Sequence, residues 1–348
     1  MHQVDAPVPL TLNIRTESFA YKQPFRISGH LFTQTEVIVA ELSDGIHIGR
    51  GEAAGVYYLG DDLPAMLTAL EQVRGVIERG ATRTELQSLL PPGGARNALD
   101  CAYWELESKQ AGMPVWELAG LQKPRSLRTT LTIGADSPQA MALASQNIKT
   151  IKLKLTGDVA LDAARVIAVR AARPDAWIGV DANQGYNVED LGTLTRMLVE
   201  QKIALLEQPL PRGNEADLDG IGRPLPFAAD ESAVSLAEIG RLAGRFDVVN
   251  IKLDKCGGLT EGLAMAARAK QMGLGVMVGN MMGSSLSMAP SFVLGQLCDV
   301  VDLDGPTFLN EDRFPSVAYQ DGYIWCDEVL WGFARDMLQP KCDSDAKN

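Results

Sequence analysis

Short apolar segments recur along the chain from about residue 128, and a helix-like segment separates each one from the next. Consecutive segments begin about 22 to 27 residues apart. That spacing is typical of repeated strand–helix units that close into a parallel barrel, and eight units favour a barrel over an open doubly wound sheet. The eight predicted strands cover residues 127–134, 150–155, 177–183, 204–209, 226–231, 248–255, 275–280 and 300–305.

The segments between these predicted strands carry helical periodicity. In residues 157–176, Val159, Val166 and Ile167 fall on one face of the predicted helix, and Pro174 is expected to end it. We therefore expect each of these helices to pack one apolar face on the barrel.

The first 126 residues follow a different pattern. Residues 10–21 and 35–54 are strand-like, with a turn signal at Asp44-Gly45 inside the second stretch, and two amphipathic helical stretches come next. We predict an α+β domain over residues 1–126, placed before a barrel over residues 127–306. Residues 317–329 are strand-like and rich in aromatic side chains, so residues 307–348 are expected to return to the first domain and complete it.

Composition narrows the class of protein. The 348 residues carry a net charge of -12, which argues against a nucleic-acid surface or an anionic membrane as partner. Residues 275–298 are uncharged but contain several polar residues, which indicates a buried strand, a loop and a short helix in place of a membrane span. Five scattered cysteines and the lack of a signal-peptide pattern predict a reduced, cytoplasmic enzyme, with homo-oligomers left open.

Three acids stand at the ends of three successive predicted strands. They are Asp181, Glu207 and Asp230. A parallel barrel brings the carboxyl ends of its strands to one face, so the three carboxylates are expected to converge there. Carboxylate oxygens are the ligands that Mg²⁺ prefers, and the triple therefore predicts a magnesium site.

Lysines stand on both sides of these acids along the chain. Lys152 and Lys154 share one face of a strand because they are two residues apart, and Lys252 and Lys255 follow the acids. A lysine inside the barrel indicates function, because an unpaired buried ammonium is costly. The second ammonium is expected to lower the pKa of the first toward neutrality, which suits a proton-transferring base.

Several motifs together carry a family resemblance over nearly the whole chain. The chain resembles the enolase superfamily in its muconate-lactonizing subgroup, and within it the dipeptide epimerases, including the bacterial L-Ala-D/L-Glu epimerases. The motifs are KxK at Lys152–Lys154, DAN at Asp181–Asn183, EQP at Glu207–Pro209, ADES at Ala229–Ser232, NIKLDKCGGLTE at Asn250–Glu261, DLDGP at Asp302–Pro306, and GGARNALDCAYWELE at 93–107.

The resemblance implies a modified TIM barrel, (β/α)₇β, with an α+β capping domain built from both termini. It implies that the acid triple holds Mg²⁺ against the carboxylate of a small dipeptide substrate, whose α-proton is then removed to give an enediolate. It assigns Lys154 and Lys255 to opposite faces of the α-carbon, and Lys152 to tuning Lys154. Asp302 and Asp304 would hold the α-ammonium of the dipeptide.

The resemblance also bears on substrate selectivity. Thr132 and Asn183 would contact the substrate. In the L-Ala-D/L-Glu epimerases an arginine in the loop near residues 25–30 binds the glutamate side chain. Here Arg26 lies earlier in that loop, so dipeptides with a different second residue stay open as substrates.

Other functions remain as alternatives at this point. An o-succinylbenzoate synthase or a cycloisomerase would keep the lysines and the metal, but its substrate has no α-ammonium for Asp302 and Asp304. Schiff-base chemistry at a barrel lysine and a non-catalytic barrel are further alternatives. His2, His30 and His47 all precede the barrel, which disfavours a barrel histidine as the second acid/base.

Overall fold

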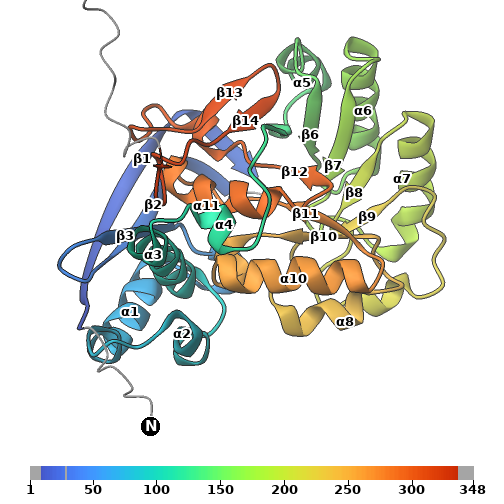
Figure 1. Ribbon diagram of the computed structural model, residues 1–348. Coiled ribbons are helices and arrows are strands. Elements are labelled where there is room, and N and C mark those ends of the chain that lie inside the picture. Colours follow the sequence, from blue (N-terminus) through green and yellow to red (C-terminus); the bar gives the residue numbers. More distant parts are fainter. Residues whose placement is uncertain (1–8, 28–29, 336–348) are drawn as a thin grey trace, which may run out of the picture.

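The chain folds into a parallel barrel with an antiparallel sheet and helices beside it (Figure 1). The computed structural model describes residues 9–27 and 30–335, and for residues 25–27, 30 and 31 it describes the backbone alone. The barrel lies to the right in Figure 1 and the N-terminal capping domain to the left.

Eight parallel strands form the barrel in simple sequence order, from β5 to β12. The backbone N–H of Thr130, next to the first strand, donates to the carbonyl of Val301 in the last one and joins the two ends of the sheet. The strands are β5 (Leu131–Ile133), β6 (Thr150–Lys154), β7 (Trp177–Asp181), β8 (Leu205–Glu207), β9 (Phe227–Ala229), β10 (Val248–Ile251), β11 (Gly275–Val278) and β12 (Val300–Val301). The predicted barrel is confirmed.

Helices cover the outside of the barrel between successive strands. They are α5 (Pro138–Ala144), α6 (Val159–Ala172), α7 (Val188–Glu200), α8 (Ile239–Leu242), α10 (Leu259–Gln271) and α11 (Ser285–Gly295), while the short helix α9 (Leu253–Cys256) lies in the turn directly after β10. Between β8 and β9 the described chain forms a short 3₁₀ helix, η2 (Glu215–Leu218), and no α-helix. After β12 the described chain forms another 3₁₀ helix, η4 (Gly305–Phe308), and no α-helix, so the eighth unit lacks its helix, as in a (β/α)₇β barrel.

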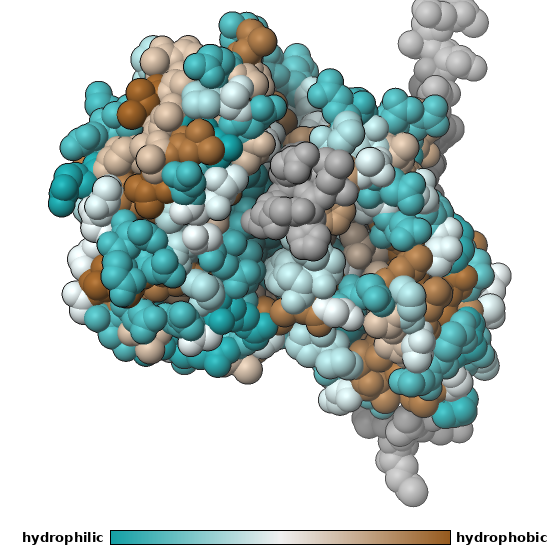
Figure 2. Space-filling view, turned by 180° about the vertical axis from the view of Figure 1, so that it is seen from behind, coloured by the Kyte–Doolittle hydropathy of each residue, from teal (hydrophilic) through white to brown (hydrophobic). Residues whose placement is uncertain are grey.

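The buried face of helix α6 differs from the predicted one. It ends before Pro174 as predicted, but Ile167 is 48% exposed while Asp162, Val166 and Val169 are buried. Asp162 belongs to the inner face because its carboxylate accepts hydrogen bonds from Tyr186 and Arg165. Figure 2 shows brown hydrophobic side chains scattered among teal hydrophilic ones on one face of the molecule.

The barrel interior is layered. Its lower layer is apolar and comprises Trp177, Leu205, Ala228, Val248, Met277 and Val300. Strand side chains alternate, so the residue two positions after Leu205 on β8 points into the same interior one layer higher, and that residue is Glu207. The polar layer at the carboxyl ends of the strands therefore lies directly next to an apolar layer inside the barrel.

The capping domain is an antiparallel sheet packed against helices. The strands are β1 (Thr11–Ile27), β2 (His30–Ser43) and β3 (Ile48–Ala53), and the helices are η1 (Tyr57–Leu59), α1 (Leu63–Glu78), α2 (Arg83–Leu89), α3 (Gly94–Ala111) and α4 (Val115–Leu118). The predicted turn lies between β2 and β3, where the Asp44 carboxylate accepts hydrogen bonds from the N–H groups of Ile46 and His47.

The C-terminal segment behaves differently from the prediction. The strands β13 (Ala318–Gln320) and β14 (Tyr323–Trp325) pair with β4 (Leu127–Arg128), next to the barrel, and not with the capping sheet. Flanking residues make the contacts to the first domain: Asn310 N–H donates to Ala20, and the Trp331 indole donates to Arg50. The division of the chain near residue 126 stays a prediction.

The uncharged run at residues 275–298 forms strand β11, a loop and helix α11. Every residue of α11 is buried, which explains its apolar composition. Within the described chain, no helix combines the length and the apolar character that crossing a bilayer requires.

Helix α3 lies so close to β3 that side chains are excluded between them. A Cβ atom at Gly51 would stand 2.0 Å from the backbone oxygen of Ala98, and one at Gly49 would stand 2.0 Å from that of Ala102. Both contacts are with backbone atoms, so the neighbour cannot give way by changing a rotamer.

We predict that Gly51→Ala lowers the free energy of unfolding by about 1–3 kcal/mol or more, because it overpacks this interface. Urea denaturation measures the change. Gly192→Ala is the control, since Gly192 lies on an exposed face of α7 with open space around it and should be neutral or slightly stabilising. Equal stability of Gly51→Ala and wild type would contradict the close packing.

Candidate active site

A cavity of about 310 Å³ lies between the capping domain and the carboxyl ends of the barrel strands. From the cap it is lined by Phe32, Gln34, Tyr57 and Tyr58, among others. From the barrel it is lined by residues of the polar layer, including Thr132, Lys152, Lys154, Asn183, Asp230, Lys252, Asp302 and Asp304. Most of the residues singled out from the sequence therefore meet at one cavity.

The three predicted metal ligands converge. Asp181 and Glu207 are register partners at the ends of β7 and β8, and Asp230 directly follows β9. One oxygen from each carboxylate lies within 4.8 Å of the others, and all three side chains are buried. An all-carboxylate set of this kind suits a hard divalent cation, so the donor chemistry of the site fits Mg²⁺.

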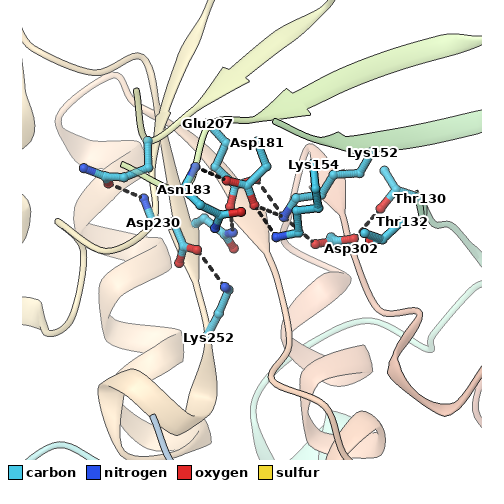
Figure 3. Close-up of polar contacts among 12 residues, drawn as sticks. Thr130, Thr132, Lys152, Lys154, Asp181, Asn183, Glu207, Asp230, Lys252 and Asp302 are labelled. Atoms are coloured by element: carbon cyan, nitrogen blue, oxygen red, sulfur yellow. Dashed lines mark hydrogen bonds and ion pairs between the residues drawn. The ribbon is translucent and has the colours of Figure 1, made fainter. Parts of the chain in front are cut away.

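Two lysines reach this cluster from β6 (Figure 3). The Lys152 ammonium lies 2.8 Å from Glu207, 2.9 Å from Asp302 and 3.1 Å from Asp181. Lys154 contacts Asp181 at 2.6 Å. Lys152 is thus surrounded by carboxylates, while Lys154 contacts one acid and lines the cavity.

Two further lysines reach the cluster from the turn after β10, and both bind Asp230. The Lys252 ammonium lies 2.7 Å from one carboxylate oxygen and the Lys255 ammonium 2.6 Å from the other. In Figure 3, Lys252 lies on the side of the cluster opposite to Lys152 and Lys154, with the acids between them.

The position of Lys255 does not suit the acid/base role predicted for it. Its side chain is fully buried and does not line the cavity. Its three N–H groups are engaged by the Asp230 carboxylate and by the backbone carbonyls of Asp230 and Asn250. Lys252, three residues earlier, is the lysine of this turn that faces the cavity.

The charges of the acid triple are strongly perturbed. Burial opposes ionisation of Asp181, but Lys154 and Lys152 outweigh it and lower the pKa of Asp181 to about 2. Burial is likewise outweighed at Asp230, where Lys252 leads the effects that hold the pKa well below its ordinary value. Burial and the charge of Asp181 raise the pKa of Glu207 to about 7. At Glu207, the nearby Lys152 ammonium does not outweigh burial and the neighbouring carboxylate.

The prediction that a neighbouring ammonium lowers the pKa of a lysine in the Lys152–Lys154 pair is wrong for Lys152. Burial does lower the pKa of Lys152, but Asp302 and Glu207 outweigh it and raise the pKa well above its ordinary value. Asp230 has the same effect on Lys252. The carboxylates converge more closely on these ammonium groups than the neighbouring lysines do, and nothing in the linear pattern gave those distances.

The two acids of the last strand differ in their partners. Asp302 binds Lys152 and accepts a hydrogen bond from the Thr130 hydroxyl. Asp304 accepts a hydrogen bond of 2.6 Å from the backbone N–H of Thr132. Burial, together with the charge of Asp302, raises the pKa of Asp304 to about 6.

The remaining predicted residues have different outcomes. Asn183 lines the cavity, and its buried side-chain oxygen has no hydrogen-bond partner in the described part of the chain. The side chain of Arg26 lies outside the described residues. Lys22, the other cationic residue described near Arg26, donates to the carbonyl of Thr307.

Two residues of the polar layer escaped the sequence prediction. Asn250 donates to Glu207 at 2.7 Å, and its position in the predicted strand over residues 248–255, two residues before Lys252, was a usable signal. Glu231 lines the cavity with a buried oxygen that has no described partner. Nothing in the pattern separated Glu231 from its neighbour Asp230.

We predict that Asp181→Asn, Glu207→Gln and Asp230→Asn each weaken Mg²⁺ binding by at least about tenfold, because each removes one anionic ligand. The readout is the rise of the melting temperature with Mg²⁺ concentration, since a ligand that binds the folded state stabilises it. Asp219→Asn is the control: Asp219 is an exposed acid paired with Arg245. Unchanged Mg²⁺ dependence in all three variants would place the cation elsewhere.

Comparisons with known proteins agree with this architecture. The family model "Mandelate racemase / muconate lactonizing enzyme, N-terminal domain" matches residues 10–120, and the model "Enolase C-terminal domain-like" matches residues 137–325. The L-Ala-D/L-Glu epimerase of Escherichia coli is 36% identical over 319 residues, which covers 90% of this chain and 99% of that protein. The N-acetyl-D-glutamate racemase of a Pseudoalteromonas species is 38% identical over 278 residues, covering 77% of this chain and 87% of that one.

Solved structures extend the comparison. An enolase family member from Agrobacterium tumefaciens with homology to dipeptide epimerases, solved with sodium and L-Ala-L-Glu, is 38% identical, with a TM-score of 0.88 over 93% of this chain and 100% of that one. The dipeptide epimerase of Methylococcus capsulatus, solved with Mg and L-Arg-D-Lys, is 29% identical, with a TM-score of 0.85 over 91% and 96% of the two chains. The chain therefore belongs to the mandelate racemase and muconate lactonizing enzyme family of the enolase superfamily, and it is an isomerase.

Proposed function

We propose that the protein is an Mg²⁺-dependent dipeptide epimerase that inverts the α-carbon of the C-terminal residue of its substrate. The observation that carries this proposal is the placement of Lys154 and Lys252 on opposite sides of a buried triple of carboxylates, both facing one cavity. Inversion requires a proton donor and a proton acceptor on opposite faces of one carbon, and this arrangement supplies them.

Asp181, Glu207 and Asp230 would hold the cation. When bound, Mg²⁺ would supply positive charge that stabilises the second negative charge that a carboxylate gains when its α-proton is removed. The weakly acidic α-proton next to a carboxylate then comes within reach of a lysine base.

Lys154 and Lys252 divide the proton transfers in this proposal. For one enantiomer Lys154 removes the α-proton and Lys252, as an ammonium, returns one to the other face; for the other enantiomer the roles reverse. Lys152 acts differently because Asp181, Glu207 and Asp302 surround its ammonium. It is a positioning residue that holds these acids together and balances their charge.

Asp304 is the residue that we propose for the α-ammonium of the dipeptide. It lines the cavity, and its described partner is a backbone N–H. Asp302 was predicted to share this role, but it already binds Lys152 and Thr130. Its contribution is to keep Lys152 and the end of β12 in place.

The specific dipeptide is a finer proposal. L-Ala-D/L-Glu, from murein peptides recycled in the cytoplasm, is supported by the similarity to the Escherichia coli enzyme. An N-acyl amino acid is the second candidate, because a relative of similar identity is an N-acetyl-D-glutamate racemase. The two substrates differ in one group that Asp304 would contact. The dipeptide has an α-ammonium, and the N-acyl amino acid has none.

We predict that the enzyme with Mg²⁺ in D₂O exchanges the α-proton of L-Ala-D-Glu, as followed by proton NMR beside other dipeptides and N-acetyl-D-glutamate. Asp304→Asn should then raise KM for a dipeptide by at least about tenfold, because the α-ammonium loses a charged hydrogen-bond partner. N-acetyl-D-glutamate is the matched control, whose KM should not rise. Exchange of N-acetyl-D-glutamate alone would favour the second candidate, and exchange of no compound would contradict the proposed reaction.

We predict that Lys154→Arg and Lys252→Arg each abolish epimerisation but leave α-proton exchange for opposite enantiomers, since one base remains on one face in each variant. Exchange is measured for the L,L and L,D dipeptides separately. Lys255→Met should instead lower the melting temperature, because it leaves two backbone carbonyls and Asp230 without their buried partner. Loss of exchange for the same enantiomer in both arginine variants would contradict the two-faced arrangement.

A further inference from the structure

The two cavity-facing lysines are held in place by different parts of the molecule. Lys154 lies on β6, which pairs with β5 and β7 inside the barrel. Lys252 lies past the end of β10, at the N-terminus of the short helix α9, where the strand ladder no longer fixes it. Its placement depends on the turn at residues 252–261, and that turn is bound by the capping domain at three points.

The first point is Asp254. One oxygen of its carboxylate accepts hydrogen bonds from the backbone N–H groups of Ala54 (2.9 Å) and Gly55 (3.0 Å), in the cap loop that carries Tyr57 and Tyr58 into the cavity. Asp254 is buried, and it has no ion-pair partner in the described part of the chain. Burial raises its pKa to about 7, so a charge at this position costs stability.

The second point is Arg96 on α3. Its guanidinium donates to the carbonyls of Cys256 (2.6 Å) and Gly257 (3.3 Å) and forms an ion pair with Glu261. A Cβ atom at Gly257 would stand 2.3 Å from the Arg96 guanidinium, which explains the glycine. The side chain of Arg96 is buried, so these bonds are shielded from water.

The third point is Asp100, one turn further along α3. Its carboxylate accepts hydrogen bonds from the Thr260 backbone N–H (2.9 Å) and hydroxyl (2.6 Å) at the start of α10. A Cβ atom at Gly258 would stand 2.5 Å from the Cβ of Asp100. Helix α3 therefore forms hydrogen bonds with this turn on both sides of the glycine pair Gly257–Gly258.

We infer that the capping domain positions Lys252 through Asp254, Arg96 and Asp100, while the barrel alone positions Lys154. This inference rests on the proposed two-lysine reaction. It assigns a function to the ARNALD stretch of α3, which touches neither the cation ligands nor the cavity. These three are positioning residues, because they act on Lys252 through the backbone of the turn at residues 252–261.

The consequence is an asymmetry between the two directions of the reaction. Loosening the turn should displace Lys252 and spare Lys154, and a displacement of about 1 Å at a reacting group costs up to about a hundredfold in rate. Asp254→Ala should therefore slow α-proton exchange of the enantiomer served by Lys252 at least tenfold. Exchange of the other enantiomer should stay within about twofold. The enantiomer that still exchanges in Lys154→Arg identifies the one served by Lys252.

Asp254→Asn is the conservative partner variant. The asparagine side-chain oxygen can accept the same two hydrogen bonds without burying a charge, so exchange of both enantiomers should return to near the wild-type rates. Rescue by asparagine would separate the loss of the two bonds from the loss of the carboxylate charge.

Arg96→Lys tests the second point, and Arg50→Lys is its matched control. Arg50 also lies in the capping domain and forms hydrogen bonds with Glu105 of α3. It differs from Arg96 because it also donates to the carbonyl of Leu330 near the C-terminus, and not to the turn at residues 252–261. Both variants should lower the melting temperature. Only Arg96→Lys should lower exchange of the Lys252 enantiomer more than that of the other, by about fivefold or more.

Equal slowing of both enantiomers in Asp254→Ala and Arg96→Lys would overturn the inference, because it would indicate general loosening of the fold. Wild-type rates in both variants would overturn it as well. Wild-type enzyme is measured in the same experiment, because the proposed reaction and the positioning of Lys252 are separate questions. If wild-type enzyme exchanges neither enantiomer of any substrate, the proposed function fails, whatever the variants do.

Discussion

Mutual neutralisation of buried charges is the constraint on which the rest of this structure depends. The interior of the barrel holds lysines and acids above an apolar floor, where an unpaired charge would cost several kcal/mol. Lys152 satisfies three acids at once, and Asp230 is shared between two lysines. The order of charged groups around the lumen follows from the pairing of neighbouring strand ends.

The same constraint sorts four similar lysines into different roles. Lys152 and Lys255 have their ammonium groups enclosed by oxygen acceptors, so they hold acids in place. Lys154 and Lys252 each contact one acid and face the cavity, so each can meet a substrate. A lysine inside a barrel is therefore not a base by virtue of burial alone; its free side has to point to the reacting carbon.

The capping domain contributes to the site in two ways. It closes the cavity with aromatic and polar side chains, and it grips the turn that carries Lys252 through α3 and the loop after β3. The close approach of α3 to β3 at Gly51 leaves no room for a side chain between these two elements of the cap. In the proposed reaction, both the lining of the substrate cavity and the placement of Lys252 would depend on this domain.

Much of this protein could be read from its sequence because barrels repeat. The spacing of apolar segments predicted the strands, and an acid at the end of three successive strands predicted a shared metal site, since parallel strand ends must meet. Which of the two lysines Lys252 and Lys255 faces the cavity is decided only by the tertiary structure. Both lie in one turn, and helix α9 directs Lys252 to the cavity and Lys255 into the protein. The partners of Asp302, the pairing of β14 with β4 and the exposure of Ile167 likewise depend on segments far apart in sequence, whose distances no local pattern encodes.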